Sequence, residues 1–371
     1  MSVASRIPFA DLSWQWQAIE ADIAPDLRDL FEASAFCLGA AVDNFERNFA
    51  AFVGVRHAIG VSSGTAALHV AVIAAGIGPG DKVLLPSHTF IATAWGVLYV
   101  GADPILCDVE PVSGTIDLVD AERRMQPGVK AIIPVHLYGQ PADMRAVQQF
   151  AERHGLIVIE DAAQAHGACY RGNRIGTLGK FACFSFYPSK NLGAAGESGL
   201  VTTNDDVAAA RMRALRNHGE AERYVHAEVG FNYRMEGIQG LVLDHKLRHL
   251  VAWTEERKRL ARRYMEGLRS LPLGLPEIIH GDHVYHLFVV RTPQRDALRK
   301  HLEARGIGSG LHYPVPLHRQ PCFSHLNLNR ASFPVADQFA NECLSLPLYV
   351  GMNDAQVDTV IGEIRRFLRA N

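Results

Sequence analysis

Residues 181–200, FACFSFYPSKNLGAAGESGL, join a strand-like apolar run to a lysine and a glycine-rich segment. Lys190 follows the apolar run directly, at the place where a chain would present an amine to a carbonyl compound. An amine that is partly desolvated and near other cationic groups can lose its proton near neutral pH and form a Schiff base. The alternative is a solvated lysine in a surface loop.

The other lysines of the chain have polar or helical surroundings that are typical of solvated surface. They are Lys82, Lys130, Lys180, Lys246, Lys258 and Lys300. Lys190 is therefore the lysine whose position favours chemistry.

Outward from this stretch, apolar runs alternate with helical segments. The predicted strands are 57–61, 82–86, 104–108, 131–136, 156–161, 181–187 and 199–203, and helices are predicted at 64–75, 89–100 and 141–154. Short apolar runs between helices indicate a sheet that is buried on both faces and is mostly parallel. The sequence therefore predicts a three-layer α/β/α domain.

The pattern changes after residue 204. Helices are predicted at 206–218 and from 234 to about 271, followed by a strand at 284–290, a helix at 294–305, a proline-rich loop at 312–321 and a last helix at 354–370. This pattern is typical of a smaller α+β domain. We place a large domain with an N-terminal arm at 1–250 and a small C-terminal domain at 251–371.

Composition narrows the function classes. The chain has 371 residues, 48% of them hydrophobic, and a net charge of −2, with no basic stripe that would indicate nucleic acid or a membrane surface as partner. Its six cysteines form no CxxC pair and no metal-binding spacing, so no metal is expected. The N-terminus lacks the pattern of a signal peptide, and no stretch is apolar enough to span a bilayer, so a cytoplasmic enzyme is expected.

Candidate site residues follow the predicted strands, because ligands of open α/β sheets bind beyond the carboxyl ends of the strands. Ser63, Gly64 and Thr65 begin a helix, where free backbone N–H groups could hold a phosphate. The alternative is an ordinary helix cap. Phe90 follows the next strand and could stack on a flat ring or lie in the core.

The run Leu156–Asp161 ends in two carboxylates, Glu160 and Asp161. Unpaired buried charge is costly, so these groups should emerge at the edge of the sheet. Their side chains point to opposite faces, because side chains alternate along a strand. One carboxylate could bind a ring nitrogen while the other caps a neighbouring segment, or both could form a polar strand end.

A phosphate cradle, a stacking aromatic ring, a carboxylate and a lysine beyond the strands of one domain together match a single ligand. Pyridoxal 5′-phosphate has a phosphate, a flat ring, a pyridinium nitrogen and an aldehyde that need these four groups. We therefore expect this cofactor.

Six motifs give a more specific indication. They are SSGTAAL (62–68), PSHTFIATA (86–94), PVHLYGQPADM (134–144), EDAAQAHGA (160–168), FSFYPSKNLGAAGESG (184–199) and GFNYRM (230–235). With these motifs, nearly the whole chain resembles the sugar aminotransferases of the DegT/DnrJ/EryC1/StrS type, which have the aspartate-aminotransferase fold (fold type I).

The resemblance implies a role for each matching residue. Lys190 would form the Schiff base and move the proton, and Asp161 would pair with the pyridine nitrogen. The other cofactor-binding residues implied are Ser63, Gly64, Thr65, Phe90, Ala163, Gln164, Ser185 and, from the other subunit, Asn232. A homodimer with shared active sites is implied as well.

The resemblance also implies a substrate class. The family transfers an amine, usually from L-glutamate, to a nucleotide-linked keto sugar. The HLYGQPADM segment and the loop 312–318 look most like members that act at C3 of a dTDP-3-keto-6-deoxyhexose. His312, Tyr313 and His318 are candidate substrate contacts, or parts of a packed loop.

Three alternatives remain beside this prediction. The first is a C4 aminotransferase acting on a dTDP-, GDP- or UDP-linked 4-keto sugar. The second is a non-catalytic regulatory protein that has this fold. The third is a sugar 3-dehydratase, which is disfavoured because that branch of the family replaces the lysine with histidine.

Overall fold

The computed structural model describes residues 6–326 and 333–370, and its centre is a seven-stranded sheet in the order β1-β9-β8-β5-β4-β2-β3. The strands are β1 (His57–Val61), β2 (Lys82–Pro86), β3 (Asp103–Cys107), β4 (Val129–Ile132), β5 (Ile157–Asp161), β8 (Phe181–Ser185) and β9 (Gly199–Thr203). β9 pairs antiparallel with both β1 and β8, while the other pairings are parallel. The prediction of a mostly parallel α/β sheet is confirmed.

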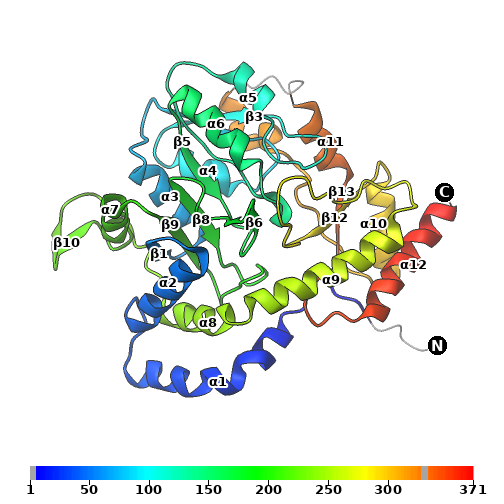
Figure 1. Ribbon diagram of the computed structural model, residues 1–371, viewed down its shortest axis with the longest axis horizontal. Helices are drawn as coiled ribbons and strands as arrows, with labels where there is room; N and C mark the ends of the chain where they lie inside the picture. The colour runs from blue at the N-terminus through cyan, green and yellow to red at the C-terminus, as the bar shows by residue number, and fades with distance from the viewer. Residues whose placement is uncertain (1–5, 327–332, 371) are drawn as a thin grey trace.

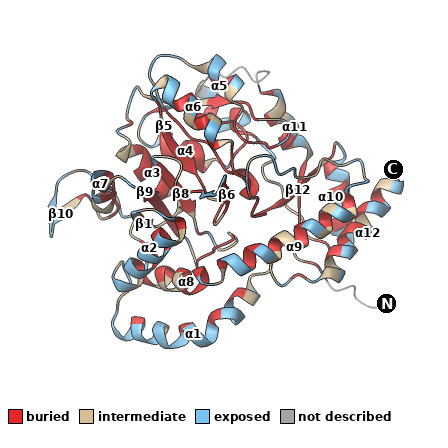
Figure 2. Ribbon diagram, in the orientation of Figure 1, coloured by how far each residue is buried: buried red, intermediate tan, exposed pale blue. Residues whose placement is uncertain are grey.

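Helices cover both faces of this sheet (Figure 1). Apolar side chains of one face pack with α2 (Ala40–Val53), α6 (Met144–His154) and α8 (Gly237–Leu247). The other face packs with α3 (Gly64–Ala74), α4 (Ala92–Leu98) and α7 (Asp206–Arg216). Figure 2 shows the strands as the buried centre between helices with exposed outer surfaces.

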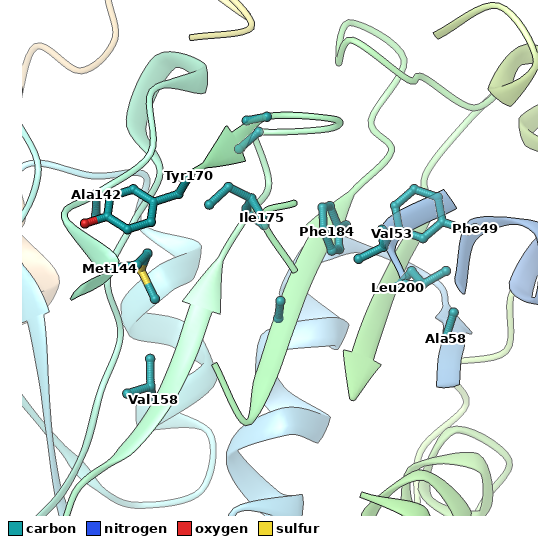
Figure 3. Close-up of a cluster of buried hydrophobic side chains, with 14 of the residues drawn as sticks. Phe49, Val53, Ala58, Ala142, Met144, Val158, Tyr170, Ile175, Phe184 and Leu200 are labelled. Carbon is teal, nitrogen blue, oxygen red and sulfur yellow. The ribbon is translucent and has the colours of Figure 1, made fainter. Parts of the chain in front are cut away.

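Strand alternation assigns each side chain to one of these two faces. On β5, Val158 belongs to the α2/α6/α8 face and Ile159 to the α3/α4/α7 face. Figure 3 shows the first of these cores, in which Phe49 and Val53 of α2 lie beside Phe184 and Leu200 of the sheet. This alternation decides which strand-end residues can meet.

Several elements were not predicted from the sequence. They are α1 (Ser13–Glu32), α2, α5 (Leu118–Arg124), α11 (Pro334–Glu342), β13 (Cys343–Leu346), the short pairs β6 (Cys169–Tyr170) with β7 (Asn173–Arg174) and β10 (Glu220–Glu222) with β11 (Val225–His226), and the 3-10 turns η1 (Leu137–Gly139), η2 (Leu317–Arg319) and η3 (Pro321–Leu326). α1 packs against α8 through Ile19 and Ile23.

The C-terminal part has a core of its own. It contains α9 (Leu250–Leu268), β12 (Phe288–Arg291) paired antiparallel with β13, α10 (Arg295–Ala304) and α12 (Asp354–Ala370). Ile7, near the N-terminus, forms a bridge to Ile307 and joins this core.

The predicted strand at 284–290 begins later than expected, because β12 starts at Phe288. The preceding residues pair with the large domain: Val284 N–H donates to Gly139 O at 3.0 Å, and Leu287 N–H donates to Tyr138 O at 3.3 Å. The segment 284–287 is therefore a connection between the two parts of the chain.

Across residues 6–326 and 333–370, no helix has both the length and the apolar character needed to cross a membrane. Over the same ranges, no group of three or more His, Cys, Asp or Glu side chains could hold a metal ion.

Candidate active site

The two carboxylates at the end of β5 serve different faces of the sheet, as alternation predicts. Glu160 is fully buried and accepts hydrogen bonds from the backbone N–H groups of Gly176, Leu178 and Gly179 at 3.2, 2.9 and 2.7 Å. His136 contacts the same carboxylate through Nε2 at 3.1 Å. Glu160 therefore caps the turn before β8.

His136 is saturated by structural contacts. Its other ring nitrogen, Nδ1, accepts the backbone N–H of Ala142 at 3.1 Å, and its side chain is fully buried. Both nitrogens are thus used to hold β4, β5 and the start of α6 together.

Asp161 lies on the opposite face, toward α3 and α4. Thr93 Oγ1 of α4 donates to its Oδ2 at 2.7 Å, and the backbone N–H of Ala163 donates to its Oδ1 at 3.2 Å. Burial raises the pKa of Asp161, and the Thr93 bond, the Ala163 bond and the charge of Lys190 oppose that rise. A carboxylate accepts about four hydrogen bonds, so Asp161 can take a further donor.

Lys190 lies in the loop after β8 and is electrostatically coupled to Asp161. Burial lowers the pKa of its amine to about 8, and the negative charge of Asp161 opposes this fall. Within the described part of the chain, its Nζ forms no hydrogen bond. An amine with this lowered pKa is partly neutral near neutral pH, and its neutral form is a nucleophile suited to an aldehyde.

The loop that bears Lys190 is fixed from several directions. Asn191 Nδ2 donates to Val284 O at 3.0 Å, and Gln239 Oε1 of α8 accepts the backbone N–H of Ala195 at 2.9 Å. A Cβ on Gly193 would lie 2.1 Å from Pro188 O, so the loop can close this tightly only with glycine there.

Lys246 was predicted to be a solvated surface residue, and that prediction is wrong. Its side chain lies between α8, α1 and the Lys190 loop, where Nζ donates to Gln15 Oε1 and to Gly193 O, both at 2.7 Å. Burial lowers the pKa of its amine to about 8. The helical pattern placed Lys246 on α8 but could not show that α1 covers it.

The N-terminus of α3 lies beside the end of β8. Ser63 caps the helix through Oγ, which accepts the N–H of Ala66 at 3.1 Å. A Cβ on Gly64 would lie 2.7 Å from Ser185 Cβ, so Ser185 approaches the helix start only because residue 64 is glycine. Together with half-buried Thr65, these residues present hydroxyl and N–H donors at the positive end of a helix.

An aromatic pair stands at the end of β2. Phe90 is 52% exposed, unusual for phenylalanine, and its ring centroid lies 5.5 Å from that of Tyr313. Gln164 Nε2 donates to the Tyr313 hydroxyl at 2.9 Å, and its Oε1 accepts the backbone N–H of Tyr138 at 2.5 Å. The structure therefore brings Phe90, Gln164 and Tyr313 together.

Two predicted substrate contacts differ in their surroundings. His312 Nδ1 contacts Ser345 Oγ at 2.8 Å, and burial and the charge of Lys190 lower its pKa to about 4. His318 bonds Ser87 Oγ at 2.6 Å through Nδ1 and Asp337 Oδ1 at 3.0 Å through Nε2. With both nitrogens occupied, His318 fastens the loop and has none left for a substrate.

Asn232 and Ala163 complete the predicted set. Ala163 is half-buried beside Asp161, whereas Asn232 is exposed and pairs through its backbone with Asn217. Within the described residues, Asn232 contacts neither Lys190 nor Asp161 of its own chain.

Thr93 is the residue that sequence reasoning missed. It lies within PSHTFIATA but received no role. One signal was present: in the helix predicted at 89–100, Thr89 and Thr93 are four residues apart and would share one face.

Comparison with known proteins relates this geometry to a family. The sequence pattern of the DegT/DnrJ/EryC1/StrS aminotransferase family matches residues 17–365. A dTDP-3-amino-3,4,6-trideoxy-alpha-D-glucose transaminase of Streptomyces venezuelae is 43% identical over 364 residues, 98% of this chain and 96% of its own.

A second relative has a different nucleotide in its name. The UDP-N-acetyl-3-dehydro-alpha-D-glucosamine 3-aminotransferase of Acidithiobacillus ferrooxidans is 42% identical over 369 residues, 99% of this chain and 100% of its own. Among solved structures, S. venezuelae DesV in complex with a ketimine intermediate matches with a TM-score of 0.95 and 43% identity, over 98% of each chain.

Proposed function

This chain belongs to the DegT/DnrJ/EryC1/StrS aminotransferase family, and from that premise we propose that it transfers an amino group from L-glutamate to C3 of a dTDP-3-keto-6-deoxyhexose. The family and fold type I make it a pyridoxal-phosphate-dependent nucleotide-sugar aminotransferase. The observation that carries the proposal is the buried amine of Lys190, which has no hydrogen-bond partner among the described residues and is electrostatically coupled to Asp161.

The choice of C3 and dTDP is supported by the relatives. The S. venezuelae relative is named for a dTDP-linked 3-amino sugar, and the A. ferrooxidans relative for a UDP-linked sugar aminated at C3. Both names share the carbon and differ in the nucleotide, so the carbon is the better supported part of the proposal.

The residues of this chain fit the cofactor. The described residues include a buried amine without a hydrogen-bond partner among them, a buried carboxylate with room for a further donor, an exposed ring at Phe90 and a helix start that Gly64 leaves open to Ser185. When bound, pyridoxal phosphate supplies an aldehyde that condenses with amines and a ring that accepts electrons from a carbon losing its proton.

The residues at the start of α3 would hold the phosphate. Ser63, Gly64 and Thr65 offer hydroxyl and backbone N–H groups, and Ser185 adds a hydroxyl from β8. The positive end of the helix dipole favours the negative charge there. Phe90 and Ala163 would lie on the two faces of the ring, and Gln164 would bind its hydroxyl.

Lys190 and Asp161 would divide the proton chemistry. The Nζ of Lys190 would move a proton from the α carbon of the donor to the C4′ carbon of the cofactor, and in the second half-reaction from C4′ to the sugar carbon. With a pKa of about 8, this amine can both accept and release a proton near neutral pH. Asp161 would accept a hydrogen bond from the ring nitrogen and keep that nitrogen protonated.

A homodimer with shared sites is part of the proposal. Asn232 is exposed in the single chain and bridges Asn217, three residues before β10 of the hairpin that projects at the far left of Figure 1. From the partner chain, such a residue could bind the phosphate. His312 and Tyr313 would contact the sugar, while His318 would hold their loop from behind.

Single-turnover spectroscopy tests the proposal. Protein loaded with pyridoxal phosphate is mixed first with L-glutamate and then with dTDP-3-keto-6-deoxyhexose, UDP-linked 3-keto and 4-keto sugars in turn. We expect glutamate to remove the absorbance of the lysine-bound cofactor and the dTDP-linked 3-keto sugar to restore it. Restoration only by a UDP-linked or 4-keto sugar would retain the enzyme class and reject the proposed substrate.

Two lysine variants control this experiment. Lys190→Ala should reduce turnover at least about 10⁴-fold, because nucleophile and proton carrier are lost together. Lys180→Ala removes an exposed lysine ten positions earlier, paired with Asp205 at 3.3 Å, and should leave turnover unchanged. Full turnover by Lys190→Ala would refute the mechanism.

A further inference from the structure

Asp161 is held by two threonine hydroxyls in series, that of Thr93 on α4 and that of Thr89 in the bend before α4. Thr93 Oγ1 lies 2.7 Å from Asp161 Oδ2, and Thr89 Oγ1 lies 2.9 Å from Thr93 Oγ1. All three residues are buried: Thr93 has no exposed surface, Thr89 has 3% and Asp161 has 5%. Water therefore cannot replace these contacts easily.

The number of hydroxyl hydrogens fixes the direction of these two hydrogen bonds. A threonine hydroxyl has one hydrogen, and an ionised carboxylate can only accept. The hydrogen of Thr93 must therefore go to Asp161, which leaves Thr93 as the acceptor for Thr89. Consecutive hydrogen bonds polarise one another, so the outer hydroxyl strengthens the inner bond.

The surroundings of Asp161 show why such support matters. The charged and titratable groups that face it are Lys190 after β8, His136 after β4, Cys183 on β8 and Tyr313 of the C-terminal loop. His136 already bonds Glu160. The amine of Lys190 would be bonded to the cofactor and would not be a donor to Asp161. Thr93 and the N–H of Ala163 are then the permanent donors to this carboxylate.

We propose that Thr93, oriented by Thr89, is a positioning residue that keeps the proton shared by Asp161 and the cofactor ring on the ring nitrogen. This inference rests on the proposed function. A donor to a carboxylate favours its ionised form. With Thr93 in place, the shared proton stays on the nitrogen, and the ring remains a strong electron acceptor. Without Thr93, the buried carboxylate becomes more basic and draws the proton to itself.

The test uses holoenzyme loaded with pyridoxal phosphate labelled with ¹⁵N in the ring. The ¹⁵N chemical shift reports directly whether the ring nitrogen carries the proton. We expect the protonated value for the wild type and a shift toward the unprotonated value for Thr93→Val, which preserves shape and removes the hydroxyl. Thr93→Ser should restore the wild-type value, and Thr89→Val should shift it by a smaller amount.

A second readout is the affinity of the apoenzyme for the cofactor. One hydrogen bond to a charged group corresponds to roughly a 10- to 100-fold change in dissociation constant. We expect Thr93→Val to weaken cofactor binding by this factor. Thr202→Val is the matched control, because Thr202 is also fully buried and its hydroxyl bonds Gly176 O at 2.9 Å, away from Asp161. It should change neither readout.

The outcomes separate this inference from the proposed function. A wild-type ¹⁵N shift in Thr93→Val would overturn the inference and leave the role of Asp161 intact. An unprotonated ring nitrogen in the wild type would refute both. If Thr93→Val does not fold, Thr89→Val tests the inference instead. An unchanged ¹⁵N chemical shift in Thr89→Val would also refute the role of the two threonine hydroxyls.

Discussion

At the scale of single residues, Lys190 owes its reactivity to burial. The sequence suggested that partial desolvation and neighbouring cations could lower its pKa. In the structure desolvation is the largest cause, whereas the charge that acts on the amine, that of Asp161, is negative and raises the pKa. The same carboxylate that would bind the ring nitrogen therefore keeps the lysine from losing its proton too readily.

This balance predicts the pH dependence of cofactor uptake by the apoenzyme. Only the neutral amine reacts with an aldehyde, so uptake should rise about tenfold between pH 7 and pH 9 and then level off, as a pKa of about 8 requires. Stopped-flow absorbance measures it. A rate that keeps rising through pH 10 would show an ordinary lysine pKa.

Asp161→Asn provides the control for that profile. Because Asp161 raises the pKa of Lys190, removal of its charge should move the midpoint of the profile to lower pH. An unmoved midpoint would show that the two side chains are not coupled.

The faces that the side chains at strand ends occupy could be predicted, because alternation and burial leave few choices. Asp161 and Glu160 were assigned to opposite faces from the sequence, and the structure confirms it. The role of Thr93 could not be predicted in the same way. It depends on α4 lying beside β5, which is a contact between segments about 70 residues apart.

At the scale of elements, Glu160 joins β5 to the turn that leads into β8. Glu160→Gln would place an amide donor against backbone donors, and we expect it to lower the free energy of unfolding by about 3 kcal/mol. Urea denaturation at fixed protein concentration measures this. Glu122→Gln, at an exposed ion pair with Arg153 and His154, should change little.

The second element-scale prediction concerns α8 and the loop it holds. Lys246→Met keeps the length of the side chain and removes its bonds to Gly193 O and Gln15 Oε1. Backbone amides in 191–199 should then exchange with solvent about tenfold faster, as loss of a buried tether lowers the local opening free energy. Hydrogen–deuterium exchange with mass spectrometry measures it.

Lys258→Met is the comparison for that experiment. Lys258 lies on α9, where it pairs with Glu255 at 2.9 Å and Asp282 at 2.6 Å, and these bonds do not involve residues 191–199. If amides 191–199 exchange equally fast in the two variants, the change comes from a general loosening of the structure and not from loss of the Lys246 hydrogen bonds.

At the scale of the whole molecule, the mostly parallel sheet and the helices on both faces followed from the pattern, but the strand order and the N-terminal helices did not. α1 buries only a narrow stripe, Ile19, Ile23 and Leu30 with Gln15, and leaves Trp16 49% exposed. Such a weak pattern is hard to separate from a loop by sequence alone. The surface it covers includes Lys246, which explains the wrong assignment of that lysine.

The proposed sharing of active sites between subunits predicts complementation between two impaired chains. Each site would take Lys190 from one chain and Asn232 from the other. A dimer of one Lys190→Ala chain and one Asn232→Ala chain therefore contains one intact site and one site with both changes. After co-refolding, activity should recover to about a quarter of the wild-type value, because half the dimers are mixed and each has one working site of two. Activity no higher than that of the separate variants would contradict shared sites.

The bond from Asn191 to Val284 O, with His286 Nδ1 3.3 Å from Asn191 Oδ1, has a consequence for protein engineering. The position of Lys190 depends partly on a segment almost a hundred positions later in the chain. The C-terminal part is therefore not an exchangeable module. A chimaera that grafts it from a relative must carry a matching pair at 191 and 284–286, or the catalytic loop will lose its anchor even though each half folds.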